Sequence, residues 1–99
     1  FLEVKGLKLD LARRVLYRKG REYRLTPKLC KLLEVFMRNK GQVLTRGFLM
    51  KVVWDTDFLD DTRTLDVHIH WLRRVIEDNP HSPVYLRTVR KVGYRFEVV

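Results

Sequence analysis

The spacing of apolar residues changes twice along this chain of 99 residues, and this change restricts the fold more than any other feature. In residues 2–24, leucines such as Leu7 and Leu9 alternate with polar side chains, which is typical of half-buried strands. From Thr26 onward, the apolar residues recur at helical spacing. Residues 85–98 are again rich in β-branched and aromatic side chains. We therefore expect a small antiparallel sheet, then helices, then strands.

Three helices are expected in the middle of the chain. The first two begin after a threonine that can cap the helix, and Pro27 suits the first helical position of the first one. The third is followed by a proline that cannot continue it. The expected bounds are Thr26 to Gly41, Thr45 to about Trp54, and residues 62–76 with Asn79-Pro80 beyond them.

Two β-rich runs, Tyr85–Val89 and Tyr94–Val98, close the chain. The four residues between them, Arg90-Lys91-Val92-Gly93, are typical of a hairpin turn. A small N-terminal antiparallel sheet, three helices and a C-terminal β-hairpin wing follow the order of a winged helix-turn-helix, which is an α+β fold. We expect one such domain over residues 1–99, because a chain of this length can bury only one core.

The composition restricts the class of protein. The chain has 45% apolar residues and no run long enough to span a membrane, so we expect a folded domain without membrane contact. Cys30 is the only cysteine and no signal peptide is recognisable, which favours the reducing cytoplasm. The net charge of +9 attracts polyanions such as nucleic acid or anionic lipid.

The expected third helix has two different faces. On a helical wheel one face is apolar and is predicted to contact the core: Leu65, His68, Ile69, Leu72, Val75 and Ile76. The other face combines cations with a tryptophan and a valine: Arg63, Thr64, Val67, His70, Trp71 and Arg74, with Asp66 and Arg73 at its flank. Cations can contact phosphates, and apolar carbons can contact thymine methyl groups, so this mixture suits the major groove of DNA. Packing of Trp71 inside the domain or against a dimer partner is the alternative.

The hairpin adds four basic residues close to this helix in the expected fold, namely Arg87, Arg90, Lys91 and Arg95. A charged run in a turn is usually only solvated. An arginine at a hairpin tip can instead enter a minor groove, where a narrow groove concentrates negative potential. Helix and hairpin would then bind the same DNA.

Two long motifs resemble the OmpR/PhoB-type effector domain of bacterial two-component response regulators. They are Arg63-Thr64-Leu65-Asp66-Val67-His68-Ile69 with Leu72-Arg73-Arg74, and Thr88-Val89-Arg90 with Val92-Gly93-Tyr94-Arg95-Phe96. The resemblance covers nearly the whole chain. It implies that the third helix binds the major groove of double-stranded DNA, that the wing touches the adjacent minor groove, and that the domain regulates transcription. It also implies an N-terminal receiver domain, regulation through a phosphorelay, and a dimer on tandem half-sites.

The resemblance implies DNA contacts at particular positions. On the helix these are Arg63, Thr64, Asp66, Val67, His70, Trp71 and Arg73, and Arg74 lies on the same face; in the wing they are Thr88, Arg90 and Tyr94, with Lys91 at the tip. His70 and Trp71 stand where many relatives have basic or small polar residues, so a base preference cannot be transferred. Lys91 stands where many relatives have Gly, so the wing turn can differ locally, and Gly93 remains available for a positive φ.

The segment 55–61 contains four acidic residues, Asp55, Asp57, Asp60 and Asp61. Relatives use the loop between the second and third helices to contact RNA polymerase, so the resemblance makes these residues a possible polymerase contact. For Asp60 and Asp61 a simpler explanation exists, because carboxylates before a helix N-terminus interact favourably with the helix dipole.

Other functions find little support in the sequence. His68 and His70 point in different directions on the helix and His81 lies beyond it, so we expect no metal site. No nucleophile motif or phosphate-binding glycine loop is present, and a cysteine on an apolar helix face is usually a core residue, so we expect no enzyme and no cofactor. The alternatives are a winged helix that contacts protein or RNA, and a DNA-binding domain attached to a sensor other than a receiver.

Overall fold

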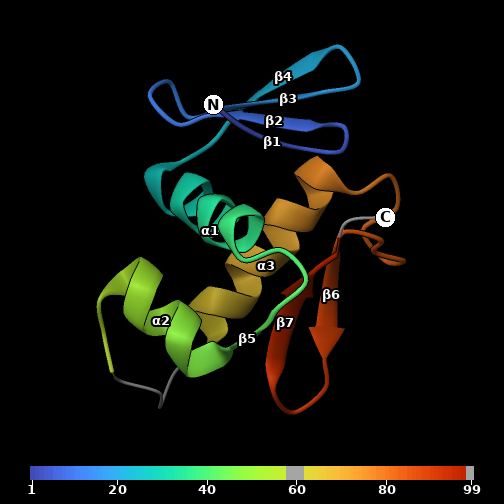
Figure 1. Ribbon diagram of the computed structural model, residues 1–99. Coiled ribbons are helices and arrows are strands. Elements are labelled where there is room, and N and C mark those ends of the chain that lie inside the picture. Colours follow the sequence, from blue (N-terminus) through green and yellow to red (C-terminus); the bar gives the residue numbers. More distant parts are fainter. Residues whose placement is uncertain (58–61, 98–99) are drawn as a thin grey trace.

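The computed structural model describes residues 1–57 and 62–97 of the chain (Figure 1). The elements are β1 (Leu2–Val4), β2 (Leu7–Asp10), β3 (Val15–Arg18), β4 (Arg21–Arg24), α1 (Pro27–Arg38), β5 (Val43–Thr45), α2 (Arg46–Trp54), α3 (Arg63–Ile76), β6 (Leu86–Val89) and β7 (Gly93–Phe96). This order confirms the winged helix-turn-helix that the apolar spacing predicts, with an N-terminal sheet, three helices and a C-terminal hairpin.

The four N-terminal strands form one antiparallel sheet in the order β1-β2-β3-β4. Leu9 and Leu16 face each other across β2 and β3, and both are fully buried. Figure 1 shows the sheet as a layer above the helices, with α1 directly below it. The alternating leucines therefore form the inner face of the sheet, as the spacing of two predicts.

As expected, a threonine is the N-cap of both α1 and α2. Oγ1 of Thr26 accepts a hydrogen bond from the Leu29 amide at 3.2 Å, and Oγ1 of Thr45 accepts one from the Phe48 amide at 3.1 Å. The end of α1 differs from the prediction, because the helix stops at Arg38, before Gly41. Asn39 ends it, and its side-chain amide donates to the carbonyl of Val35 at 2.7 Å.

A short strand that the sequence did not indicate joins the hairpin. β5 pairs with β7, so the hairpin is part of a three-stranded sheet in the order β5-β7-β6. The sequence left Gly93 available for a positive φ, but in the structure Lys91 has that conformation, with φ of 66°. A glycine is needed at position 93 because β5 leaves no space for a side chain there. A Cβ at this position would lie 2.0 Å from the carbonyl oxygen of Leu44.

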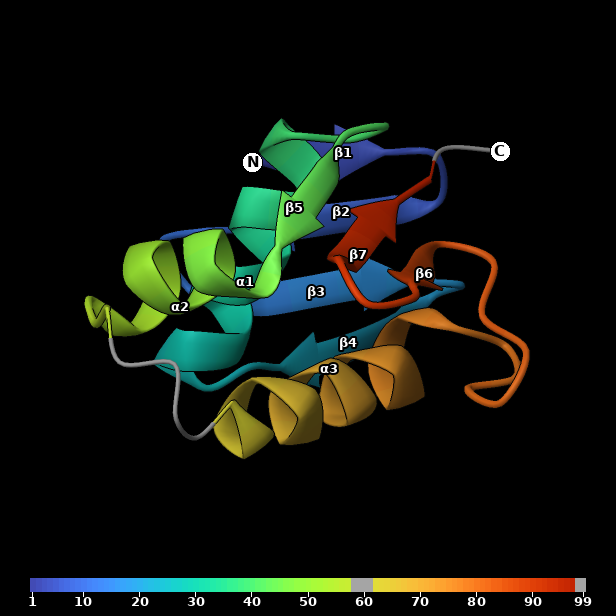
Figure 2. The ribbon, with the colours of Figure 1, turned by 90° about the horizontal axis from the view of Figure 1, so that it is seen from below.

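One core holds the two sheets and the three helices together. Its largest fully buried side chains include Phe36 of α1, Leu49 of α2, Ile69 of α3 and Phe96 of β7. Cys30 is buried in the same core, as predicted for an apolar helix face. In the view from below, α3 lies along one side of the molecule with the β6–β7 hairpin next to it (Figure 2). None of the helices in the described part of the chain is long and apolar enough to cross a membrane.

Candidate nucleic-acid interface

The two faces of α3 are as the sequence predicts. Leu65, Ile69, Leu72 and Ile76 are buried against the core, and His68 and Val75 on the same face are partly buried. The opposite face is exposed and consists of Arg63, Thr64, Val67, His70, Trp71 and Arg74. Val67 and Trp71 remain 43% and 46% exposed, so the domain itself covers them only in part. The alternative that Trp71 is buried inside the domain is therefore wrong, and its packing against a dimer partner stays a prediction.

Three aromatic side chains form a row between α2 and the exposed face of α3. The rings of Trp54 and His68 meet edge to face with centroids 5.0 Å apart, and the centroids of His68 and Trp71 are 5.2 Å apart. Nδ1 of His68 lies 2.8 Å from the carbonyl oxygen of Thr64 on the same helix. A carbonyl oxygen can only accept a hydrogen bond, so this nitrogen donates and fixes the plane of the imidazole.

Asp66, which the sequence predicted to contact DNA, is at the centre of a polar network. Its carboxylate oxygens lie 2.7 and 2.8 Å from the two terminal nitrogens of Arg46, and the Tyr94 hydroxyl donates to it at 2.8 Å. Arg46 also donates to the side chain and the carbonyl of Thr62. This network connects α2, the beginning of α3 and β7.

The network shifts the pKa values of its members. The Arg46 guanidinium, followed by the Tyr94 hydroxyl, holds the pKa of the Asp66 carboxyl below its ordinary value, although partial burial opposes this. The hydrogen bond to Asp66 raises the pKa of Arg46. Burial, with the nearby Asp66 carboxylate, raises the pKa of Tyr94, which is only 6% exposed. Asp66 is therefore an anion that accepts from a cation and a neutral phenol.

Arg73 connects α3 to the wing. Its Nε donates to the Leu86 carbonyl at 3.0 Å, and Nη2 donates to Oγ1 of Thr88 at 2.8 Å. Its guanidinium carbon lies 5.7 Å from the centre of the Tyr94 ring. Burial lowers the pKa of Arg73, although the ordinary value is so high that the side chain stays charged. The side chain thus holds β6 against the helix.

A hollow of about 520 Å³ lies between α3, the turn that follows it, and β6. It is lined by His70, Arg73, Pro80, His81, Pro83, Arg87 and Thr88. Because both His70 on the exposed face of α3 and Arg87 of the wing border it, the helix face and the wing form one continuous surface. We call this the helix–wing surface. Arg90 and Lys91, at the tip of the hairpin, are exposed beyond it.

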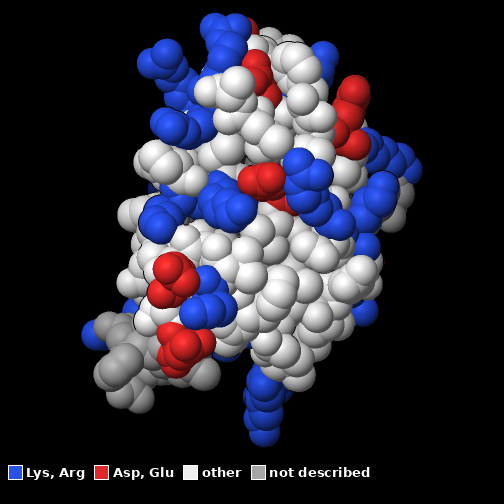
Figure 3. All heavy atoms as spheres, turned by 60° about the vertical axis from the view of Figure 1, so that its left-hand side comes forward, with Lys and Arg blue, Asp and Glu red and all other residues white. Residues whose placement is uncertain are grey.

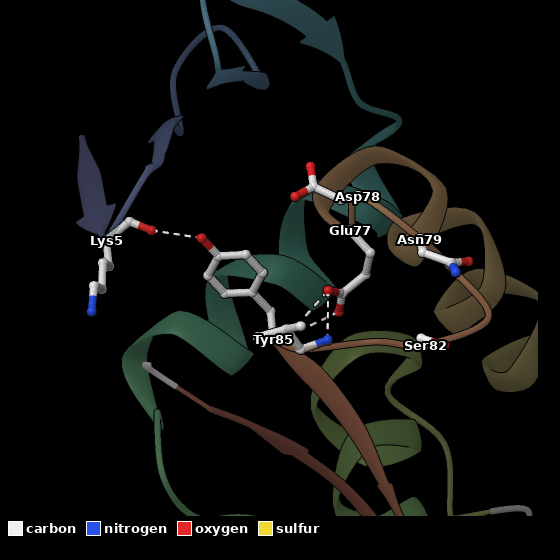
Figure 4. A pocket seen from close by; sticks show the side chains of 7 residues that line it. Lys5, Glu77, Asp78, Asn79, Ser82 and Tyr85 are labelled. Carbon is white, nitrogen blue, oxygen red and sulfur yellow. Dashed lines mark hydrogen bonds between the residues drawn. The ribbon is translucent and has the colours of Figure 1, made fainter.

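Glu77, directly after α3, was not singled out from the sequence, yet it is almost completely buried, with 4% exposed. Its carboxylate accepts hydrogen bonds of 2.8 to 3.1 Å from the amides of Val84, Tyr85 and Leu86. Figure 4 shows the contact with Tyr85. The Tyr85 hydroxyl donates to the carbonyl of Lys5 at 2.8 Å. These groups border a pocket of about 420 Å³ and attach the beginning of β6 to the end of α3 and to the N-terminal sheet.

Two of the four acidic residues predicted as a polymerase contact, Asp60 and Asp61, lie outside the described residues. Asp55 and Asp57 are highly exposed, and each has a carboxylate oxygen 3.6 Å from Nζ of Lys51. The lower left of Figure 3 shows two acidic groups on either side of a basic one. Lys51 lies in α2, and Asp55 follows four positions later, directly after the helix. This spacing could have indicated their ion pair from the sequence.

Charge is unevenly distributed on the side of the molecule formed by α1 and α2. In Figure 3, basic groups gather over the N-terminal sheet, and much of the surface below them is uncharged. Within residues 1–57 and 62–97 no group of three or more His, Cys, Asp or Glu side chains is close enough to hold a metal ion.

Comparison with known proteins shows the family. Residues 20–96 match the family model described as "Transcriptional regulatory protein, C terminal". The sensory transduction protein RegX3 of Mycolicibacterium smegmatis is 47% identical over 97% of this chain, and the transcriptional regulatory protein PhoP of Bacillus subtilis is 48% identical over 82%. The chain spans only 42% of RegX3 and 34% of PhoP.

Solved structures agree with this result. The DNA-binding domain of Klebsiella pneumoniae RstA, in complex with the RstA box, has a TM-score of 0.88 at 27% identity, and the match covers 98% of this chain and 96% of that one. The DNA-binding domain of E. coli CadC has a TM-score of 0.85 at 33% identity over 98% of this chain and 91% of that one. This chain therefore belongs to the OmpR/PhoB-type family of winged-helix C-terminal domains of transcriptional regulatory proteins.

Proposed function

We propose that this domain binds specific sites in double-stranded DNA, with α3 in the major groove and the β6–β7 hairpin at the adjacent minor groove. The observation that carries the proposal is the helix–wing surface. His70 of the exposed face of α3 and the exposed Arg87 and Thr88 of β6 line one hollow, and the exposed cations and apolar side chains of α3 lie on the same helix face as His70. Phosphates, base edges and a minor groove can then be contacted by one rigid surface.

The positions that the sequence predicted have different roles in this proposal. Exposed side chains contact DNA directly: Arg63, Thr64, Val67, His70, Trp71, Arg74, Thr88, Arg90 and Lys91. Asp66, Arg73 and Tyr94 act as positioning residues, because their hydrogen-bonding groups are engaged within the domain. Arg73 still adds positive charge to the hollow that it borders.

A gel-shift titration tests the proposal with duplex DNA, duplex RNA and single-stranded DNA of one sequence at fixed salt. A duplex selected from a random library should bind best. Each neutralised phosphate adds about −0.9 to the slope of log K against log salt, so four to six contacts give roughly −4 to −5. Equal affinity for duplex RNA, or a flat salt dependence, would contradict the proposal and favour a winged helix that binds RNA or protein.

Arg90→Ala tests the wing separately from the helix. Loss of one phosphate contact should weaken selected and random duplexes similarly and reduce the salt slope by about 1. Lys31→Ala, which removes an exposed cation of α1 outside the helix–wing surface, is the matched control. If both variants behave alike, the hairpin does not contact DNA.

We further propose that Asp55 and Asp57 contact RNA polymerase. Their exposure supports this, and their ion pairs with Lys51 offer a competing explanation. In the full-length protein, changing both residues to Asn should lower transcription in vitro and leave DNA affinity unchanged. Unchanged transcription would refute the contact, and a several-fold rise in affinity would show that these acids act by repelling phosphate.

The complete protein is expected to contain more than this domain, because the chain spans less than half of its curated relatives. We propose an N-terminal receiver domain, a cytoplasmic location, dimeric binding to tandem half-sites and no enzymatic activity of this domain. Light scattering of the full-length protein on duplexes with one and two half-sites tests the dimer. One protomer on two half-sites would contradict it.

A further inference from the structure

Val67 and Trp71 form an apolar strip on the exposed face of α3. They are four positions apart, so they lie next to each other on the helix. Both are more than two-fifths exposed, while Thr64, His70 and Arg74 around them are polar or charged. A large apolar side chain left exposed within a cationic face indicates a partner with both negative charge and an apolar feature.

The Trp71 ring is supported from inside the domain. His68 contacts it at a centroid distance of 5.2 Å, and Trp54 contacts His68 in turn at a centroid distance of 5.0 Å. The hydrogen bond from Nδ1 of His68 to the Thr64 carbonyl stops the imidazole from turning away. Less side-chain entropy is therefore lost when Trp71 binds a partner, since its position is already restricted.

The chemistry of the strip limits what it can recognise. A valine side chain forms no hydrogen bonds, and an indole offers one N–H donor and no acceptor. On the base edges of the major groove, the prominent apolar feature is the C5 methyl group of thymine. Phosphates offer no apolar surface, so the strip is suited to bases and the flanking cations to the backbone.

We propose that Trp71, held by His68 and Trp54, is a specificity-determining residue that packs against a thymine methyl group in the major groove. This inference rests on the proposed binding of duplex DNA. It assigns His68 and Trp54 as positioning residues, because they act through Trp71. It also predicts that the bound DNA sequence has a thymine opposite the middle of α3.

Replacement of thymine by deoxyuridine tests the proposal, because this change removes the methyl group and keeps every hydrogen-bonding group. The probe is a duplex selected from a random library with the domain, in which each thymine is replaced in turn. At one position uracil should weaken binding about fourfold. This corresponds to about 0.8 kcal/mol for one buried methylene, at tenfold per 1.4 kcal/mol.

Three variants identify the residue that contacts the methyl group. Trp71→Ala should bind thymine and uracil duplexes equally at that position. His68→Ala should reduce the fourfold ratio, because the indole loses its support, whereas a purely structural role would lower affinity and leave the ratio intact. Arg90→Ala, in the wing, should weaken both duplexes and keep the ratio. Thermal melting of each free variant confirms that it is folded.

The possible results separate this inference from the proposed function. If no duplex binds better than RNA or single strands, the proposed function fails. If duplex DNA binds but uracil has no effect at any position, duplex binding stands and the inference is wrong. If the fourfold ratio persists in Trp71→Ala, another residue such as Val67 contacts the methyl group and the assignment of Trp71 is wrong.

Discussion

Replacement of Glu77 by Gln should destabilise the domain, although it exchanges only one carboxylate oxygen for an NH₂ group. The carboxylate accepts from three backbone amides, and it is 4% exposed. A glutamine side chain keeps one acceptor oxygen, but its NH₂ group is a donor. It would face backbone amides that are also donors, so no hydrogen bond could form there. Hydrogen bonds to charged groups contribute about 1.5–3 kcal/mol, and an unsatisfied buried donor costs about 1–3 kcal/mol.

The loss of the carboxylate does not affect the three amides equally. Val84 is exposed, so water can replace the carboxylate there, whereas the amide of the fully buried Leu86 has no access to water. We therefore expect a total loss of about 2–3 kcal/mol for Glu77→Gln, and about 3–5 kcal/mol for Glu77→Ala. For a domain of this size, 2–3 kcal/mol corresponds to a decrease in melting temperature of roughly 10–20 °C.

Urea unfolding and thermal melting measure this loss, and hydrogen exchange of the Leu86 amide should become faster. Asp78→Asn is the matched control, because Asp78 is the next residue, is exposed, and forms ion pairs only with Arg18 and Lys19 among the contacts described. It should leave the melting temperature nearly unchanged. If Glu77→Gln is no more destabilising than this control, the three amides find other partners and the assigned role of Glu77 is wrong.

Two further perturbations test the network at Asp66 and the close approach at Gly93. Because Arg46 lowers the pKa of Asp66 in the folded state, its ion pair stabilises the domain above the ordinary pKa near 3.8, and this contribution disappears as pH falls through the lowered value. Urea unfolding should therefore show a deficit for Asp66→Asn at pH 7 that shrinks toward pH 2; a constant deficit would contradict this. Gly93→Ala should cost at least about 2 kcal/mol, because the new Cβ would lie 2.0 Å from the carbonyl of Leu44 and backbone cannot move aside cheaply. A melting temperature equal to that of the wild type would show that β5 is not held against β7 as described.

Local signals were sufficient to predict most of the fold. The caps at Thr26 and Thr45 and the apolar spacing of α3 depend on neighbours within one or two helical turns, so they are visible in the sequence. β5 was not predicted, because it has only three residues, the last of which is the cap of α2, and so short a segment carries no periodicity of its own. Only its pairing with β7, far along the chain, makes this segment a strand.

The polar contacts were harder to predict, because they join distant parts of the sequence. Asp66 and Tyr94 were both identified as functional positions, yet nothing in the sequence indicates that they bond to each other across 28 positions. The role of Gly93 was not visible in the sequence for a similar reason. A glycine in a turn suggests a positive φ, whereas the space it leaves for Leu44 is a tertiary requirement.

The connections between α3 and the wing restrict how this domain can approach a partner. Asp66 near the beginning of α3 bonds to Tyr94, Arg73 in its last turn bonds to Leu86, and Glu77 just after it bonds to the amides before β6. Since these contacts lie at three different heights along the helix, rotation of the hairpin relative to α3 breaks at least one of them. The distance between the helix face and the wing tip is thus set by the protein. If both enter DNA grooves as proposed, any bending or groove narrowing needed to meet them is a deformation of the DNA, and its energy depends also on base pairs that no side chain touches.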